Sequence, residues 1–171
     1  VAGPRSLRVT APPVAKERLV ANNSMVTLVH AIDREIRVLH FEAEPRYEVK
    51  FVRRALGGDA NVALISLVRT ANNKFYRLGV GSSDELADGF PTQLDALFAF
   101  DMVILGSVAV EDLSEPQQRA LEQFVVRRGG SLLLLGGTRS FAQGGWGASS
   151  RLRNLLPVVL PERQTRAPVE R

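Results

Sequence analysis

The chain has 171 residues, of which 45% are hydrophobic and 23% are charged, and these are ordinary values for a globular domain with its own core. Its 22 basic and 18 acidic residues are intermixed and leave a formal charge of +4, without the lysine- or arginine-rich block typical of nucleic-acid binding. Cysteine is absent, which excludes disulfides, thiolate metal sites and a cysteine nucleophile, and no apolar run approaches the roughly 20 residues that a membrane helix needs.

The first 34 residues differ in pattern from the rest of the chain. Two segments, RSLRVTAPP and SMVTLVHAI, are β-like and are joined by a polar stretch. In the second segment Met25, Thr27 and Val29 alternate with their neighbours in the way that strand residues do. We therefore expect a short N-terminal β segment that is separate from the remainder of the protein.

A regular alternation of strands and helices begins at residue 36. Short apolar runs predict four strands, at 36–41, 62–68, 102–107 and 131–135. Strands that alternate with helices indicate βαβ units and a parallel sheet. Runs such as MVIL and LLLL fit strands that are buried on both faces, so the predicted fold class is α/β with a parallel sheet and flanking helices.

Two helices are predicted clearly between these strands. The first covers EPRYEVKFVRRAL, with Pro45 in its first turn and glycines after its end. The second begins at Ser114, where SEPQ fits a capping box, and ends at Gly129. The apolar residues expected on one face of the first helix are Tyr47, Phe51, Val52, Ala55 and Leu56.

The carboxyl ends of parallel strands form the functional edge of such a sheet, and here they carry polar residues. One interpretation is an anion pocket, in which guanidinium groups, hydroxyls and glycine N–H groups surround a phosphate, sulfate or carboxylate. The alternative is that Glu42, Glu44 and Glu48 pair with the arginines and hold the loops. The candidate ligand-binding residues are Glu42, Arg46, Arg69, Ser107, Gly136, Gly137, Thr138 and Arg139.

Other kinds of site fit the sequence less well. GGTRSF lacks the ending of a P-loop, and GVGSSD lacks the third glycine of a dinucleotide fingerprint. His30 and His40 fall within predicted strands, so neither a metal site nor a histidine base beside Ser107 or Ser140 is expected. Trp146 either stacks on a sugar or base or plugs its own loop, and the second interpretation is favoured. No cofactor is expected.

Several motifs, in order, resemble those of one known family. The runs RVLHFEAEPRYEVKFVRRAL, ISLVRTANNKFYRLG, DELADGFP, FDMVILGSV and FVVRRGGSLLLLGGTRSFAQGGW are similar to the class I glutamine amidotransferase-like domain of large bacterial membrane proteins, which often also carry a von Willebrand factor A-type domain. The resemblance covers about Arg37 to Pro157 and implies a flavodoxin-like sheet with the strand order 2-1-3-4. The preceding ERLVANNSMVTLVHAID resembles the last hairpin of an immunoglobulin-like adhesion domain.

The resemblance also indicates what this chain lacks. In true amidotransferases the strand that corresponds to SLLLL leads into a nucleophile elbow with a cysteine, and here Gly136 and Gly137 stand in that place. The turn is expected to keep the backbone geometry of an elbow without its chemistry, so the chain is not expected to be a glutaminase. The implied function is a non-catalytic module for interaction or ligand sensing. The alternative is an enzyme of unknown reaction that acts on a small anionic or polar ligand at the carboxyl edge of the strands.

The expected organisation has three parts. Residues 1–34 are the C-terminal hairpin of a preceding immunoglobulin-like domain or a linker, 35–160 are the amidotransferase-like α/β domain, and 161–171 are a flexible tail. The start without methionine and the family segments that are missing after Pro157 lead us to expect a piece of a longer protein. Its expected partners are other domains of that parent protein and a small anion, with no nucleic acid. Membrane association is expected only through segments outside this chain, with the extracytoplasmic side favoured.

Overall fold

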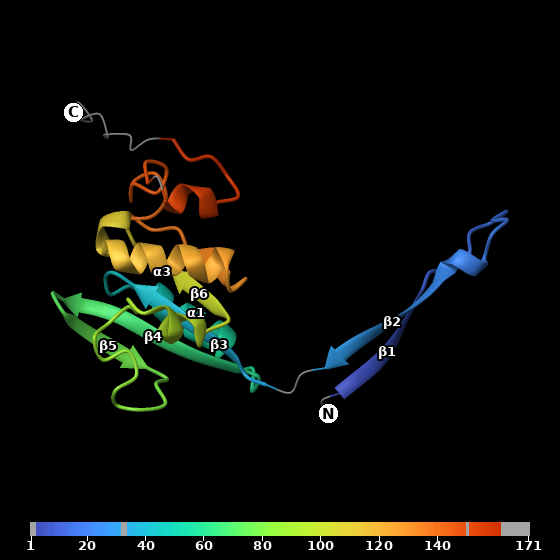
Figure 1. Cartoon of the computed structure of the whole chain (residues 1–171), viewed down its shortest axis with the longest axis horizontal. Coiled ribbons are helices and arrows are strands. Elements are labelled where there is room, and N and C mark those ends of the chain that lie inside the picture. Colours follow the sequence, from blue (N-terminus) through green and yellow to red (C-terminus); the bar gives the residue numbers. More distant parts are fainter. Residues whose placement is uncertain (1–2, 32–33, 150, 162–171) are drawn as a thin grey trace. The chain divides into compact units, whose positions relative to one another are not determined.

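The computed structural model describes residues 3–31, 34–149 and 151–161 (Figure 1). The chain divides into two compact units, Val1–Arg34 and Glu35–Arg171. The tail expected at 161–171 lies outside the described residues, apart from Pro161. Among the residues that are described, no helix is both long and apolar enough to cross a membrane.

The first unit is an antiparallel hairpin of two strands. β1 (Gly3–Thr10) pairs with β2 (Ser24–Ala31), and a short 3-10 helix, η1 (Ala21–Asn23), precedes β2. The register places Val9 opposite Met25 and Leu7 opposite Thr27, so the predicted β segment is present. Nearly every residue of both strands is exposed, and a hairpin that buries so little is at most marginally stable by itself.

The second unit contains a mixed five-stranded sheet with the order β5-β4-β3-β6-β7. Four of its strands are parallel: β3 (Ile36–Glu42), β4 (Val62–Ala71), β6 (Met102–Leu105) and β7 (Ser131–Leu134). They correspond to the four predicted strands and stand in the predicted order, with β3 in the centre of the sheet.

The fifth strand corrects the prediction of a purely parallel sheet. β5 (Lys74–Leu78) runs antiparallel to β4, to which a tight turn joins it. Asn73 in that turn has a φ of 55°, a left-handed conformation that asparagine adopts more readily than most residues. The sequence here is rich in turn residues, and that pattern concealed a hairpin with a short edge strand.

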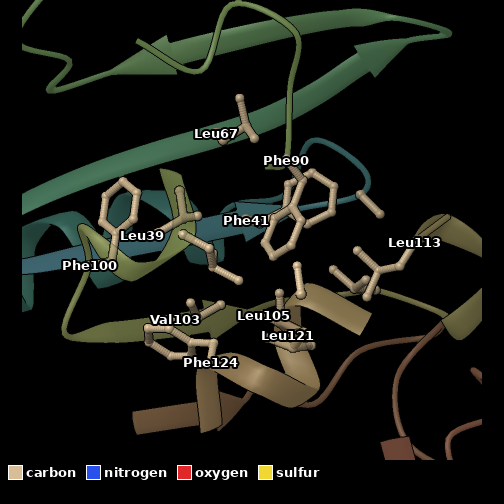
Figure 2. Close-up of a cluster of buried hydrophobic side chains, with 14 of the residues drawn as sticks. Leu39, Phe41, Leu67, Phe90, Phe100, Val103, Leu105, Leu113, Leu121 and Phe124 are labelled. Carbon is tan, nitrogen blue, oxygen red and sulfur yellow. The ribbon is translucent and has the colours of Figure 1, made fainter. Parts of the chain in front are cut away.

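Helices cover both faces of the sheet. They are α1 (Glu48–Leu56), α2 (Leu94–Phe98) and α3 (Glu115–Val126), with two 3-10 turns, η2 (Val110–Asp112) and η3 (Leu152–Leu155). The predicted capping box opens α3, since the Ser114 Oγ accepts from the Gln117 N–H and the Ser114 N–H donates to the Gln117 side chain. Figure 2 shows the main core, in which Leu121 and Phe124 of α3 pack against the inner strands and loops.

The opposite face has a smaller apolar cluster under α1. Val38, Leu64 and Ile104 are buried there, and Val52 and Leu56 of α1 pack against them. This cluster places α1 over the centre of the sheet.

The prediction of which residues of α1 face the sheet is partly wrong. Tyr47 is 85% exposed and Phe51 is 64% exposed, so these two aromatic rings point away from the sheet. Val52 and Leu56 do contact the sheet, and the polar Arg53 also lies on that side, where it reaches Ser66.

Candidate functional site

The candidate site begins at Glu42, the last residue of the central strand β3. Side chains alternate along a strand, so Val38, His40 and Glu42 share the face under α1. Val38 belongs to the apolar cluster there, whereas His40 and Glu42 extend the same row towards the carboxyl edge and are both fully buried. A charged group therefore lies at the end of a hydrophobic layer and needs partners.

Glu42 has these partners in full. Its Oε2 accepts hydrogen bonds from the Ser107 N–H at 2.9 Å and the Arg46 Nε at 3.1 Å. Its Oε1 accepts one from the Arg46 Nη2 at 3.1 Å and lies 3.2 Å from the His40 Nε2. Arg46 thus grips both oxygens of the carboxylate, which is the strongest geometry for such a pair.

These contacts set the ionisation of the pair. Burial raises the pKa of Glu42, but hydrogen bonds from His40, Arg46 and the Ser107 N–H outweigh it and hold that pKa below its ordinary value of 4.5. Burial lowers the pKa of Arg46, and Glu42 more than reverses this effect and raises it. A general acid or base works best with a pKa near the operating pH, so a carboxylate held ionised in this way is poorly suited to proton transfer.

His40 is the residue of this network that sequence reasoning left out. Its Nε2 donates to Glu42, because an ionised carboxylate can only accept. Its Nδ1 is buried and has no hydrogen-bond partner among the described residues. Ser66 lies opposite His40 on β4, and its Oγ accepts from the Arg53 Nη1 at 3.4 Å. The signal was available in the letters HFE, since residues two apart on a strand share a face.

The other two arginines meet at a different acid. The Nη2 atoms of Arg69 and Arg139 both contact the Oδ1 of Asp112, the latter at 2.7 Å. The Oδ2 of Asp112 accepts from the Ala109 N–H at 2.8 Å, and the Arg69 Nε donates to the Ala43 carbonyl at 3.2 Å. The Asp112 side chain is only 5% exposed, so one buried carboxylate holds both guanidinium groups.

The alternative prediction, that Glu42, Glu44 and Glu48 pair with the arginines, is correct for Arg46. It names the wrong acids for Arg69 and Arg139. Arg46 pairs with Glu42 and lies 3.7 Å from Glu48, as that alternative expected. Glu44 instead accepts a hydrogen bond from the Thr138 hydroxyl at 3.2 Å. Asp112, the true partner of the others, lies in η2 after β6, at the same edge of the sheet. An acid that follows the third strand was the signal that sequence reasoning missed.

The glycine turn after β7 contacts Arg46 and Ser107, the partners of Glu42. The Arg46 Nη1 donates to the Gly136 carbonyl at 3.2 Å, and the Arg139 N–H donates to the Ser107 Oγ at 3.2 Å. A Cβ on Gly137 would lie 2.8 Å from both the Arg46 Nη1 and the Ser107 Oγ. The structure thus brings the predicted site residues together in two groups. The first group is Glu42, Arg46, Ser107, Gly136 and Gly137. In the second group Arg69 and Arg139 contact Asp112, and Thr138 is bonded separately to Glu44.

The turn does not have the backbone of a nucleophile elbow. An elbow holds its nucleophile in a sharp and strained turn. Neither Gly136 nor Gly137 has a φ in the left-handed region, which is instead adopted nearby by Phe141, with a φ of 53°. The expectation that the turn keeps elbow geometry is therefore wrong, and the close approach of Arg46 and Ser107 explains Gly137 instead.

Two further residues near the turn are structural. Trp146 is fully buried in the main core and its Nε1 donates to the Val108 carbonyl at 2.8 Å, so it is a packing residue and offers no stacking platform. Ser140 is also buried, with its Oγ 2.9 Å from the carbonyl oxygens of Gly106 and Leu135. Neither side chain is free for chemistry.

A pocket of about 390 Å³, open to solvent, lies beside the Asp112 group. Within the described parts of the chain, no group of three or more histidine, aspartate or glutamate residues is placed to hold a metal ion. The residues that line the pocket are Ala43, Glu44, Pro45, Arg69, Thr70, Ala71, Asn72, Asp112 and Arg139.

Comparisons of the chain with protein-family models, with curated proteins and with solved structures found no match.

Proposed function

We propose that this chain is a non-catalytic, amidotransferase-like module with a flavodoxin-like fold, which serves interaction or ligand sensing in a larger membrane-anchored bacterial protein. The strand order β4-β3-β6-β7 supports the flavodoxin-like assignment, because it is the arrangement of the first strands in that doubly wound fold. The bacterial and membrane-anchored setting rests on the sequence resemblance.

The observation that carries the proposal is the glycine turn after β7. By the sequence resemblance, Gly136 and Gly137 take the place of an amidotransferase nucleophile, and the chain contains no cysteine. At Gly137 the neighbouring Arg46 and Ser107 leave no room for a side chain without rearrangement. The buried carboxylate Glu42 beside this turn is fully engaged and is held ionised. Together these features favour a structural use of the edge over a catalytic one.

The alternative of an enzyme is favoured by one observation, the pocket of about 390 Å³ with charged residues in its wall. Perturbed carboxylates in clefts are candidates for catalysis. Here the perturbed carboxylate is Glu42, which does not line that pocket, and its pKa moves away from neutrality. Binding without turnover is therefore the better-supported use of the pocket.

The proposal is tested by two assays on the purified chain. Glutamine should release no ammonia above a heat-killed control. In an unbiased thermal-shift screen, at least one small molecule should raise the melting temperature, because a bound ligand stabilises the folded state by mass action. Reproducible glutamine turnover that co-purifies with the chain would overturn the non-catalytic assignment.

A further inference from the structure

We infer that the pocket beside Asp112 binds the anionic group, a carboxylate or a phosphate, of a small molecule through Arg69 and Arg139. The inference rests on the proposed function, because it names the chemical class of ligand that a sensing module would hold. The pocket volume of about 390 Å³ falls at the small end of the range for small-molecule sites. Since the pocket is open, it suits one charged group of a molecule whose remainder stays in solvent.

The two arginines are fixed before any ligand arrives. Both guanidinium groups contact the same oxygen of Asp112, and the Asp112 side chain is 5% exposed. A backbone N–H from Ala109 holds the other carboxylate oxygen, and the Ala43 carbonyl accepts from the Arg69 Nε. Groups that are already ordered lose little conformational freedom on binding, which favours affinity.

Unused N–H donors, rather than net charge, favour an anion beside Asp112. The two guanidinium groups share the Asp112 carboxylate, and Glu44 lines the same pocket, so two positive charges face two negative ones there. Glu111 adds a contact to Arg139 at 3.4 Å, but its side chain is 67% exposed and water screens such a pair strongly. Each guanidinium group also carries more N–H donors than its hydrogen bonds use, and paired donors of this kind match carboxylate and phosphate oxygens.

The other residues that line the pocket show which groups belong to the anion site and which do not. The neutral residues Thr70 and Asn72 also line the pocket, and the Thr70 hydroxyl donates to the Lys74 carbonyl at 3.3 Å. Glu44 also lines the pocket, is bonded to Thr138, and opposes an incoming anion. Arg46 is not part of the site, because Glu42 and the Gly136 carbonyl engage it. The site is thus narrower than the cluster of three arginines that the sequence predicted.

The experiment measures the melting temperature of the full chain in titrations of sodium phosphate, sodium malonate and sodium chloride at matched ionic strength. Phosphate at high concentration stabilises most proteins without binding, so the criterion is an effect that saturates at low millimolar anion. We expect phosphate or malonate, but not chloride, to meet it. The phosphate titration tests for a tetrahedral anionic group, and the malonate titration tests for a planar carboxylate.

Variants locate the effect. Arg69→Ala and Arg139→Ala should each weaken binding at least about tenfold, because each removes charge-assisted hydrogen bonds. Glu44→Gln should tighten binding, since it removes the opposing charge. Arg119→Ala is the matched control: it removes an arginine that pairs with Glu115 on the exposed surface of α3, and it should leave anion binding unchanged.

Two results would overturn the inference: no saturable effect in the wild type, or an effect that survives both Arg69→Ala and Arg139→Ala. If an alanine variant fails to fold, Arg139→Lys keeps the positive charge beside Asp112 but loses the planar fork, and weaker binding is again expected. If no anion shows saturable binding and no glutamine is hydrolysed, only this inference is contradicted and the proposed function is not. Glutamine turnover would defeat the proposed function and leave the anion measurement intact.

Discussion

Arg46 grips both oxygens of Glu42, with its Nε 3.1 Å from Oε2 and its Nη2 3.1 Å from Oε1. The two residues are four apart in sequence, yet no helix joins them, because Glu42 ends β3 and Arg46 precedes α1. The pair therefore ties the loop between strand and helix to the carboxyl edge of the sheet. Through the Gly136 carbonyl, Arg46 also ties in the turn after β7.

Breaking this pair should be strongly destabilising. The Glu42 side chain is fully buried and that of Arg46 is 14% exposed, so Arg46→Ala leaves a buried carboxylate without its main partner. We expect a loss of about 3–5 kcal/mol in the free energy of unfolding, measured by urea denaturation. The control, Arg119→Ala, breaks a surface pair with Glu115 and should cost less than about 1 kcal/mol. Equal effects from the two variants would contradict the importance given to the buried pair.

The contribution of Glu42 should depend on pH. Burial raises its pKa, but hydrogen bonds from His40, Arg46 and the Ser107 N–H outweigh burial and hold the pKa below 4.5. The unfolded state therefore binds this proton more readily, so the stabilisation is present above about pH 4.5 and is lost as the pH falls towards the folded pKa. The difference in unfolding free energy between wild type and Glu42→Gln should shrink as the pH falls below that value. A constant difference would contradict the shift.

The two glycines of the turn after β7 should respond differently to alanine. A Cβ on Gly137 would lie 2.8 Å from both the Arg46 Nη1 and the Ser107 Cβ, whereas the nearest atom to a Cβ on Gly136 is in Phe141 at 3.6 Å. We expect Gly137→Ala to cost about 1–3 kcal/mol, as overpacked positions do, and Gly136→Ala to be close to neutral. Thermal unfolding of both variants measures this, and the reverse order would show that the turn packs differently.

The hairpin should be dispensable for the fold of the second unit. The chain divides between Arg34 and Glu35, and the sheet and helices of the second unit have their own core. A variant that begins at Glu35 should unfold cooperatively, with a melting temperature within about 4 °C of the full chain, which corresponds to about 1 kcal/mol. A variant without a cooperative transition would show that residues 1–34 are integral to the α/β unit.

Local patterns were enough to predict the four parallel strands. The four strands are short, strongly apolar runs, and β3 and β6 are buried almost throughout because they lie between other strands and under helices. The start of α3 was equally readable, since Ser114 and Gln117 form a local capping box. Interactions of this kind depend on residues that are close in the sequence.

The parts that sequence reasoning missed depend on residues that are distant in the chain. Asp112 comes 43 positions after Arg69 and 27 before Arg139, and only the folded sheet brings the three together. The outward aromatic ring of Phe51 was misplaced because α1 also directs Arg53 inwards, to Ser66 on β4. Sequence patterns predicted which edge of the sheet carries the charged groups, but not how those groups pair.

Trp146 gives this chain an optical probe of one unit only. It is the only tryptophan in the sequence, and its indole ring is fully buried within the second unit. Intrinsic fluorescence excited at the indole band therefore follows the α/β unit, and it is silent when the hairpin of the first unit opens. Far-ultraviolet circular dichroism registers both units. A melting experiment followed by both signals thus separates the two transitions without any added label.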